Sequence, residues 1–296
     1  MDNIAAFLRY ITAEKNYSAH TLRAYQKDLV DFARHCSTSY QLNNLTEVHY
    51  AMVRDFIISL SKHGLSMRSI NRKCVTLNSF YSYLCTIGVI DMHPLAQHKS
   101  LKAKKSFIVP FSVVEVERAI EQIDRSTFSG LRDVIAIELL YATGMRQAEL
   151  IGLKISDIDW VQQRLRILGK RNKERIVPML PSLMDSLKAY CQQREEIDNA
   201  SEHNFLLITD KGKKTYPSFV YRLIKLYFRG VSDKMRTSPH VMRHSFATHM
   251  LDAGADINVV KEILGHESLA ATQEYTKVQL PKVQDAYRAA HPRAKK

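Results

Sequence analysis

The chain has 296 residues, of which 45% are hydrophobic and 25% charged, a composition typical of a globular protein with room for two domains. Its 43 lysine and arginine residues outnumber 30 acidic ones, and the net charge of +13 favours a polyanionic partner, either nucleic acid or, less often, an anionic membrane. Because the sequence has no apolar run of about 18 residues, no signal-peptide pattern and no C-x-x-C pair, we expect a cytoplasmic protein with reduced cysteines.

Residues 1–92 show the apolar spacing of helices throughout. Apolar side chains recur at the spacing of a helix face in four runs: Ile4, Phe7, Leu8 and Ile11; Leu22, Tyr25, Leu29 and Phe32; Val53, Phe56, Ile57 and Leu60; Ile70, Leu77, Phe80, Tyr81 and Leu84. We therefore expect an all-helical domain here. The last run begins with SMRSINRK, whose Arg68, Arg72 and Lys73 stand beside small hydroxyl residues. They are DNA-binding candidates, because such a helix end suits a phosphate backbone, although a solvated basic face explains them equally well.

The stretch 93–110, HPLAQHKSLKAKKSFIVP, breaks the helical pattern. It has prolines near both ends and is rich in lysine, which predicts an interdomain linker able to contact DNA. Basic charge lies on both sides of it: residues 1–105 hold 14 basic and 7 acidic residues, and residues 106–296 hold 29 and 23. Two domains that bind one duplex explain this distribution better than a single basic tail.

Beyond the linker, the sequence indicates more helices and one β-hairpin. Ser112 and Glu115 match a capping box, and a second helix covers about 129–142. Leu165 and Ile167 then alternate with arginines before the charged turn GKRNK, which predicts a hairpin. Helices resume for most of the remainder.

The segment SPHVMRHSFATHML, residues 238–251, predicts a helix that begins with Ser238 as N-cap and Pro239 as its first residue. His240 and Arg243 then share a face near a helix N-terminus, which attracts anions such as phosphate. A metal site built on the histidines at 240, 244 and 249 is the rival interpretation. It lacks a cysteine or carboxylate within the helix, so we interpret His244 and His249 as structural histidines near the core.

Other candidate side chains stand at the ends of predicted helices. His266 follows Gly265, which ends a helix capped by Asp256, and Tyr275 comes nine residues after that histidine. Taken alone, such a tyrosine is a surface residue. Upstream, Arg146 precedes Glu149 by three residues. The pair is either a salt bridge or an arginine held rigid by a carboxylate to serve another group.

Together these side chains fit one chemistry. Arg146 and Arg243 can clamp the non-bridging oxygens of a phosphodiester, while histidines bond the same oxygens or move a proton. Lys170, in the hairpin turn, can reach a leaving oxygen, and the Tyr275 hydroxyl can attack phosphorus. Since phosphoryl transfer needs mainly positioning and charge neutralisation, the set predicts catalysis without a metal or other cofactor.

The motifs ATGMRQAEL, LGKRNKERIVP, SPHVMRHSFATHML and LGHESLAATQEYT, in this order, resemble the tyrosine recombinase (phage integrase) family. The ending AYRAAHPRA is similar to the Xer members, and to the XerD type most of all. The resemblance implies that the catalytic residues are Arg146, Lys170, His240, Arg243, His266 and the nucleophile Tyr275. Glu149 is implied as a support that orients its neighbouring arginine.

The resemblance also implies a mainly helical, two-domain, C-shaped clamp with a small β-sheet. A SAM-like core-binding domain would cover 1–92, a linker 93–110, and a mixed α/β catalytic domain 111–296, whose last helix docks on a neighbouring protomer. Implied is a site-specific recombinase that acts as a homo- or hetero-tetramer on two DNA sites, through a 3′-phosphotyrosyl intermediate and a Holliday junction. It would resolve chromosome dimers with a second Xer recombinase and a translocase of the FtsK type. A mobile-element integrase and a non-catalytic architectural DNA-binding protein are the alternatives.

Overall fold

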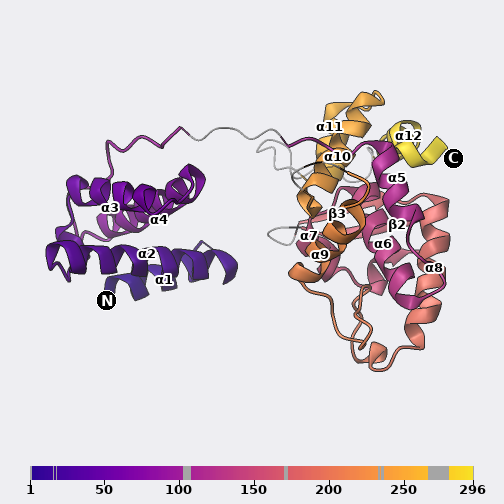
Figure 1. The fold of residues 1–296 in the computed structure, drawn as a ribbon, viewed down its shortest axis with the longest axis horizontal. Coiled ribbons are helices and arrows are strands. Elements are labelled where there is room, and N and C mark those ends of the chain that lie inside the picture. The colour runs from indigo at the N-terminus through magenta and orange to yellow at the C-terminus, as the bar shows by residue number, and fades with distance from the viewer. Residues whose placement is uncertain are drawn as a thin grey trace. The chain divides into compact units, whose positions relative to one another are not determined.

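The computed structural model describes residues 2–15, 17, 19–102, 108–169, 173–232, 234, 237–265 and 280–295. The chain divides into two compact units, Met1–Ser106 and Phe107–Lys296 (Figure 1). The finer assignment of 93–110 as a DNA-contacting linker stays a prediction. None of the described helices is long and apolar enough to cross a bilayer.

The N-terminal unit is helical, as the apolar spacing predicted. It contains α1 (Asp2–Ala13), α2 (Ala19–Tyr40), the short 3₁₀ turn η1 (Leu45–Glu47), α3 (Tyr50–Lys62) and α4 (Met67–Thr86). Its core joins the predicted apolar stripes, with Phe7, Leu29, Phe32 and Phe80 almost fully buried. The rings of Phe7 and Phe80 pack there edge to face, at an interplanar angle of 77° and with their centroids 5.5 Å apart.

One charge cluster inside this unit corrects a prediction from the sequence. Lys73 is buried, and its ammonium donates to Asp28 at 3.0 Å and to Asp31 at 2.8 Å. It is therefore an internal ion-pair residue, and its position argues against the predicted phosphate contact. Arg72 also bonds to Asp28 but keeps an exposed side chain, and Arg68 is exposed, so both still lie where DNA can reach them.

The C-terminal unit is mainly helical around a small sheet, which confirms the predicted fold class. Its elements are α5 (Val113–Glu121), α6 (Phe128–Thr143), α7 (Gln147–Gly152), η2 (Ile155–Asp157), β1 (Ile158–Asp159), β2 (Arg164–Leu168), β3 (Glu174–Pro178), α8 (Pro181–Glu195), η4 (Ala200–Glu202), α9 (Pro217–Phe228), α10 (Pro239–Asp252), α11 (Ile257–Leu264), α12 (Leu280–Ala290) and η5 (Pro292–Lys295). The predicted capping box is present at the start of α5. Helix α6 is buried from Gly130 to Thr143 and packs against α8 and α10, so it forms the centre of this unit.

The sheet is antiparallel in the order β1-β2-β3. Leu165 pairs with Val177 and Ile167 with Arg175, and the side chains of Leu165 and Ile167 are buried as the alternation predicted. The hairpin turn at 170–172, with Lys170, lies outside the described residues.

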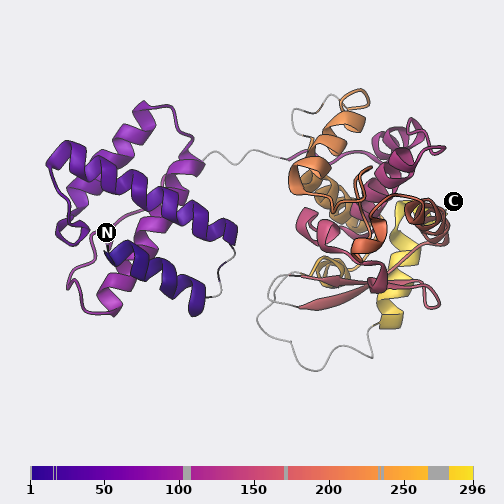
Figure 2. The same cartoon turned by 90° about the horizontal axis from the view of Figure 1, so that it is seen from below.

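Helix α12 packs on its own unit, beside the sheet (Figure 2). Tyr287 is fully buried, and its hydroxyl donates to the carbonyl of Ala142 at 3.0 Å. Beyond the helix, His291 stacks on Tyr287, and Arg293 donates to the buried carboxylate of Glu138 at 2.8 Å. Exchange of this helix into a neighbouring protomer would break these contacts, and docking of the helix there stays a prediction.

The packing of helix α12 on its own unit should become less stable at acid pH. Burial lowers the pKa of His291 from 6.5 to about 4, with the charge of Arg293 acting in the same direction. The packed state therefore favours the neutral ring. As the pH falls from 6.5 towards 4, the free energy that stabilises this packing should decrease by roughly 3 kcal/mol. Amide hydrogen exchange of α12, corrected for its intrinsic pH dependence, should show the loss of protection. His291→Phe should remove most of the pH dependence, and equal protection at about pH 7 and about pH 4.5 in the wild type would contradict the account.

Candidate active site

Arg146 stands at the start of α7, where a tight turn follows α6. Gly144 ends α6 with φ of 58°, and a Cβ there would lie 2.5 Å from Cδ1 of Phe246, so only glycine fits. The next residue, Met145, is buried in the core. Arg146 then occupies the N-cap position of α7, with a side chain that is 38% exposed.

Glu149 holds both the backbone and the side chain of Arg146. The backbone N–H of Arg146 donates to Oε2 of Glu149 at 2.8 Å, and its Nη1 donates to Oε1 at 2.7 Å. The carboxylate itself is only 5% exposed. The pair is therefore a salt bridge that holds a half-exposed arginine in one orientation, and its service to another group stays a prediction.

Arg175, on β3, is the site residue that the sequence analysis missed. Its Nη2 donates to Oε2 of Glu149 at 2.7 Å, and its Nε donates to the carbonyl of Ile263 in the last turn of α11 at 2.7 Å. The signal was present in the hairpin pattern. Val177 and Arg175 are two residues apart and share the buried face of the sheet, where an arginine needs a partner.

The pKa of Glu149 follows from these neighbours. Burial alone raises the pKa of this carboxyl, but the hydrogen bonds and charge of Arg175, with those of Arg146, outweigh burial and leave the pKa below its usual range. The carboxylate is therefore ionised at neutral pH.

Arg243, in the second turn of α10, completes the cationic group. Its Nη1 donates to the carbonyl of Gly144 at 2.7 Å and its Nη2 to that of Leu264 at 2.8 Å. Burial, and then the charge of Arg146, lower the pKa of Arg243 to about 10, so the guanidinium stays charged at neutral pH. The charges of Arg146 and Arg175 lower this pKa and that of Glu149 raises it, so the three arginines and the carboxylate lie within electrostatic reach of one another.

The histidines of α10 occupy different surroundings. The helix begins with Pro239 as predicted, and His240 is exposed in its first turn, on the same face as Arg243. His249 shares a 2.8 Å hydrogen bond with the hydroxyl of Tyr141, so it is a structural histidine as predicted. His244 is exposed, and its predicted place near the core is wrong. Among the residues that the structure describes, no three histidine, cysteine or acidic side chains gather in a metal-binding arrangement.

Lys170, His266 and Tyr275 lie outside the described residues. The residues just before two of them, Gly169 and Gly265, are described and lie beside Glu149 and Arg175. Gly169 comes just before Lys170, and a Cβ at this glycine would lie 3.5 Å from Oε1 of Glu149. Gly265, just before His266, ends α11 with φ of 64°, and a Cβ there would lie 3.2 Å from Cδ of Arg175.

Among the described residues, two guanidinium groups bind the carboxylate of Glu149, and a third, that of Arg243, is close enough for the charge of Arg146 to lower its pKa. Arg146 is the most exposed of those bound to Glu149, and the partly buried Arg243 is fixed by helix-end carbonyls. Such an arrangement can bind a phosphate group and stabilise the additional negative charge that develops on its oxygens during phosphoryl transfer.

Removal of the central carboxylate should destabilise this unit strongly. Glu149→Gln leaves like charges facing one another without their counter-charge, so the free energy of unfolding should fall by roughly 3 kcal/mol. Urea unfolding measures the loss. The control is Glu174→Gln, which changes an exposed hairpin glutamate 3.8 Å from Arg166 and should cost less than about 1 kcal/mol. Equal small losses in both variants would contradict the central place of Glu149.

Comparisons with known proteins agree with this chemistry. Residues 111–280 match the model described as "Phage integrase family", and residues 4–87 match "Phage integrase, N-terminal SAM-like domain". The "Tyrosine recombinase XerC" of Staphylococcus aureus (strain MRSA252) is 35% identical over 292 residues, covering 98% of this chain and 97% of the relative. That of Myxococcus xanthus is 38% identical over 295 residues, covering 97% of each.

Two solved structures show the same fold. The XerH site-specific recombinase bound to difH substrate superposes with a TM-score of 0.67 at 23% identity, covering 95% of this chain and 84% of that one. The Tn1549 transposon integrase in complex with transposon right end DNA gives 0.70 at 19% identity, covering 99% of each. From the family matches and the XerC relatives together, the chain belongs to the phage integrase family and is a tyrosine recombinase, an enzyme of site-specific DNA recombination.

Proposed function

We propose that the chain cuts and rejoins double-stranded DNA with Tyr275 as nucleophile. The tyrosine oxygen forms a bond to the scissile phosphorus, and the bond from phosphorus to the 5′-oxygen breaks. The result is a 3′-phosphotyrosyl enzyme and a free 5′-hydroxyl. Rejoining is the reverse reaction, in which a 5′-hydroxyl attacks the phosphotyrosine. Because the phosphodiester bond energy is kept in the intermediate, the reaction needs no ATP.

The observation that carries this proposal is the cationic group around Glu149. Arg146 and Arg243 are fixed by charge-assisted hydrogen bonds before any substrate arrives. Preorganised cations stabilise a pentavalent phosphorane without the cost of reorganisation at the moment of reaction. We assign His266 to the same oxygens, Lys170 to protonation of the leaving 5′-oxygen, and His240 to the proton of the attacking tyrosine.

For the biological role, we propose Xer-type resolution of chromosome dimers in the cytoplasm. The support is the XerC name of relatives that span nearly the whole chain. The enzyme would work as a tetramer on two DNA sites, with a second Xer recombinase and a translocase of the FtsK type. The ending AYRAAHPRA is similar to XerD, whereas the relatives are named XerC, so the two indications point to different members of such a pair. The assignment of this chain to the XerC or the XerD type stays a prediction.

A mobile-element integrase is the second candidate, favoured by the fold of the Tn1549 integrase. A non-catalytic DNA-binding protein would lack a working nucleophile or clamp. The bonds that fix Arg146 and Arg243 support the enzyme, and tests of the nucleophile and the general acid decide between the two.

Tyr275→Phe should bind DNA but form no covalent complex. A nicked substrate lets the cut 5′ end diffuse away, so the wild type accumulates trapped protein–DNA adduct, which a denaturing gel resolves. Tyr190→Phe is the matched control, because the hydroxyl of this buried tyrosine of the same unit donates to the carbonyl of Leu206, within the core. Undiminished adduct from Tyr275→Phe would overturn the assignment, and no adduct from the wild type would overturn the proposed function.

Lys170→Ala should slow cleavage by about 10²–10⁴-fold, the usual contribution of a general acid. A 5′-thiolate leaves without a proton, so a substrate with sulfur at the bridging 5′ position should restore most of the rate. Lys188→Ala, at an exposed lysine of α8, should behave as the wild type on both substrates. If the variant at Lys170 cuts the sulfur substrate no faster than the ordinary one, this lysine has another role.

A further inference from the structure

Arg175 connects segments that carry the proposed catalytic residues or adjoin them in the sequence. Its Nη2 bonds to Glu149, which holds Arg146, and its Nε bonds to the carbonyl of Ile263, three residues before His266. Its strand, β3, begins at Glu174, four residues after Lys170 in the sequence. One guanidinium thus contacts two of these segments and belongs to the third.

The bond to Glu149 controls the orientation of Arg146. Oε2 of this carboxylate accepts from both the Arg146 backbone and Arg175, while Oε1 accepts from the Arg146 side chain. Without Arg175, the buried carboxylate loses a charged donor on Oε2 and is held by its two bonds to Arg146 alone. Arg146 would then keep its charge but lose its fixed position, because its Nη1 partner is the second oxygen of the same group.

The bond to α11 fixes the end of that helix. The last carbonyls of a helix have no partner within it, and here two arginines supply donors to consecutive ones. Arg175 donates to Ile263, and Arg243 donates to Leu264. A side chain at position 265 would also press against Arg175, so the close approach of the two segments depends on Gly265.

We propose that Arg175 is a positioning residue for strand cleavage, which acts through Glu149 on the orientation of Arg146 and also fixes the end of α11 through the carbonyl of Ile263. The inference rests on the proposed function. Arg175 is not assigned to the phosphate itself, because its side chain is 10% exposed against 38% for Arg146, and its Nε and Nη2 are bonded to protein oxygens.

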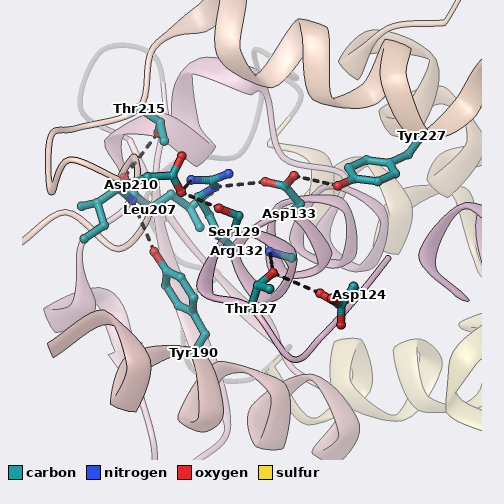
Figure 3. A network of polar contacts seen from close by, with 12 residues as sticks. Asp124, Thr127, Ser129, Arg132, Asp133, Tyr190, Leu207, Asp210, Thr215 and Tyr227 are labelled. Atoms are coloured by element: carbon teal, nitrogen blue, oxygen red, sulfur yellow. Dashed lines mark hydrogen bonds and ion pairs between the residues drawn. The ribbon is translucent and has the colours of Figure 1, made fainter. Parts of the chain in front are cut away.

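Arg132 offers a matched control in the same unit. This buried arginine of α6 donates from Nε to Asp133 at 3.0 Å and from Nη1 to Asp210 at 2.8 Å, and it lies 4.7 Å from the ring centre of Phe219. Figure 3 shows the network, in which Asp133 also accepts from Tyr227. These partners differ from those of Arg175, so Arg132→Gln measures what the loss of a buried arginine costs in stability alone.

The experiment compares two nicked substrates under single turnover. One has an ordinary scissile phosphate, and the other a methylphosphonate, in which a methyl group replaces a non-bridging oxygen and removes its charge. Cleavage of the neutral linkage depends less on Arg146. A variant that misplaces this arginine should therefore lose less of its cleavage rate on the methylphosphonate than on the phosphate. Arg175→Gln should slow cleavage of the phosphate by about 10²-fold, the effect of a small misplacement, and raise the phosphonate-to-phosphate rate ratio about tenfold.

The reference variants define the outcomes. Arg146→Gln should raise the same ratio, Arg132→Gln should leave it at the wild-type value, and Arg175→Lys, which keeps the charge but not the planar fork, should fall between wild type and Arg175→Gln. If the ratio rises in Arg146→Gln but not in the Arg175 variants, this inference is wrong and the proposed function stands. If Arg175→Gln does not fold, the ratio in Arg175→Lys decides. No cleavage by the wild type overturns the proposed function instead.

Discussion

The catalytic unit depends on one buried carboxylate that must remain ionised. Glu149 lies between Arg146 and Arg175, and burial alone would raise the pKa of its carboxyl. The two guanidinium groups reverse that effect, and in return the carboxylate fixes both of them. Removing Glu149 takes the counter-charge from both arginines, and removing either arginine leaves the buried carboxylate with one charged partner in place of two, so the three side chains depend on one another.

Helix ends place the rest of the cluster. Gly144 and Gly265 adopt the left-handed conformation that closes α6 and α11, and the carbonyl oxygens near these ends face Arg243 and Arg175. The negative ends of two helix dipoles therefore stabilise cations that would otherwise repel one another. Protein oxygens balance part of the positive charge, and a phosphate group would supply the remaining negative charge.

The sequence patterns predicted those features that depend on residues close together in the chain. The three-residue spacing of Arg146 and Glu149 predicted their contact, and the alternation around Leu165 and Ile167 predicted the hairpin. The partners of a residue in a distant segment did not follow from the local patterns. Arg175 bonds to Ile263, 88 positions away, and Lys73 to Asp28, 45 positions away, so the first was missed as a site residue and the second was interpreted as a DNA contact. A charged residue on a buried face is the sequence signal that both share.

A double-mutant cycle on the cleavage of a nicked substrate tests most directly whether Glu149 unites the two arginines. Arg146→Gln, Arg175→Gln and the double variant are compared with the wild type in single-turnover rate. If Arg175 acts through the orientation of Arg146, the double variant should be hardly slower than Arg146→Gln, with a coupling energy of about 1–3 kcal/mol. Two losses that multiply, with a coupling energy near zero, would show that the arginines act independently and would contradict the account.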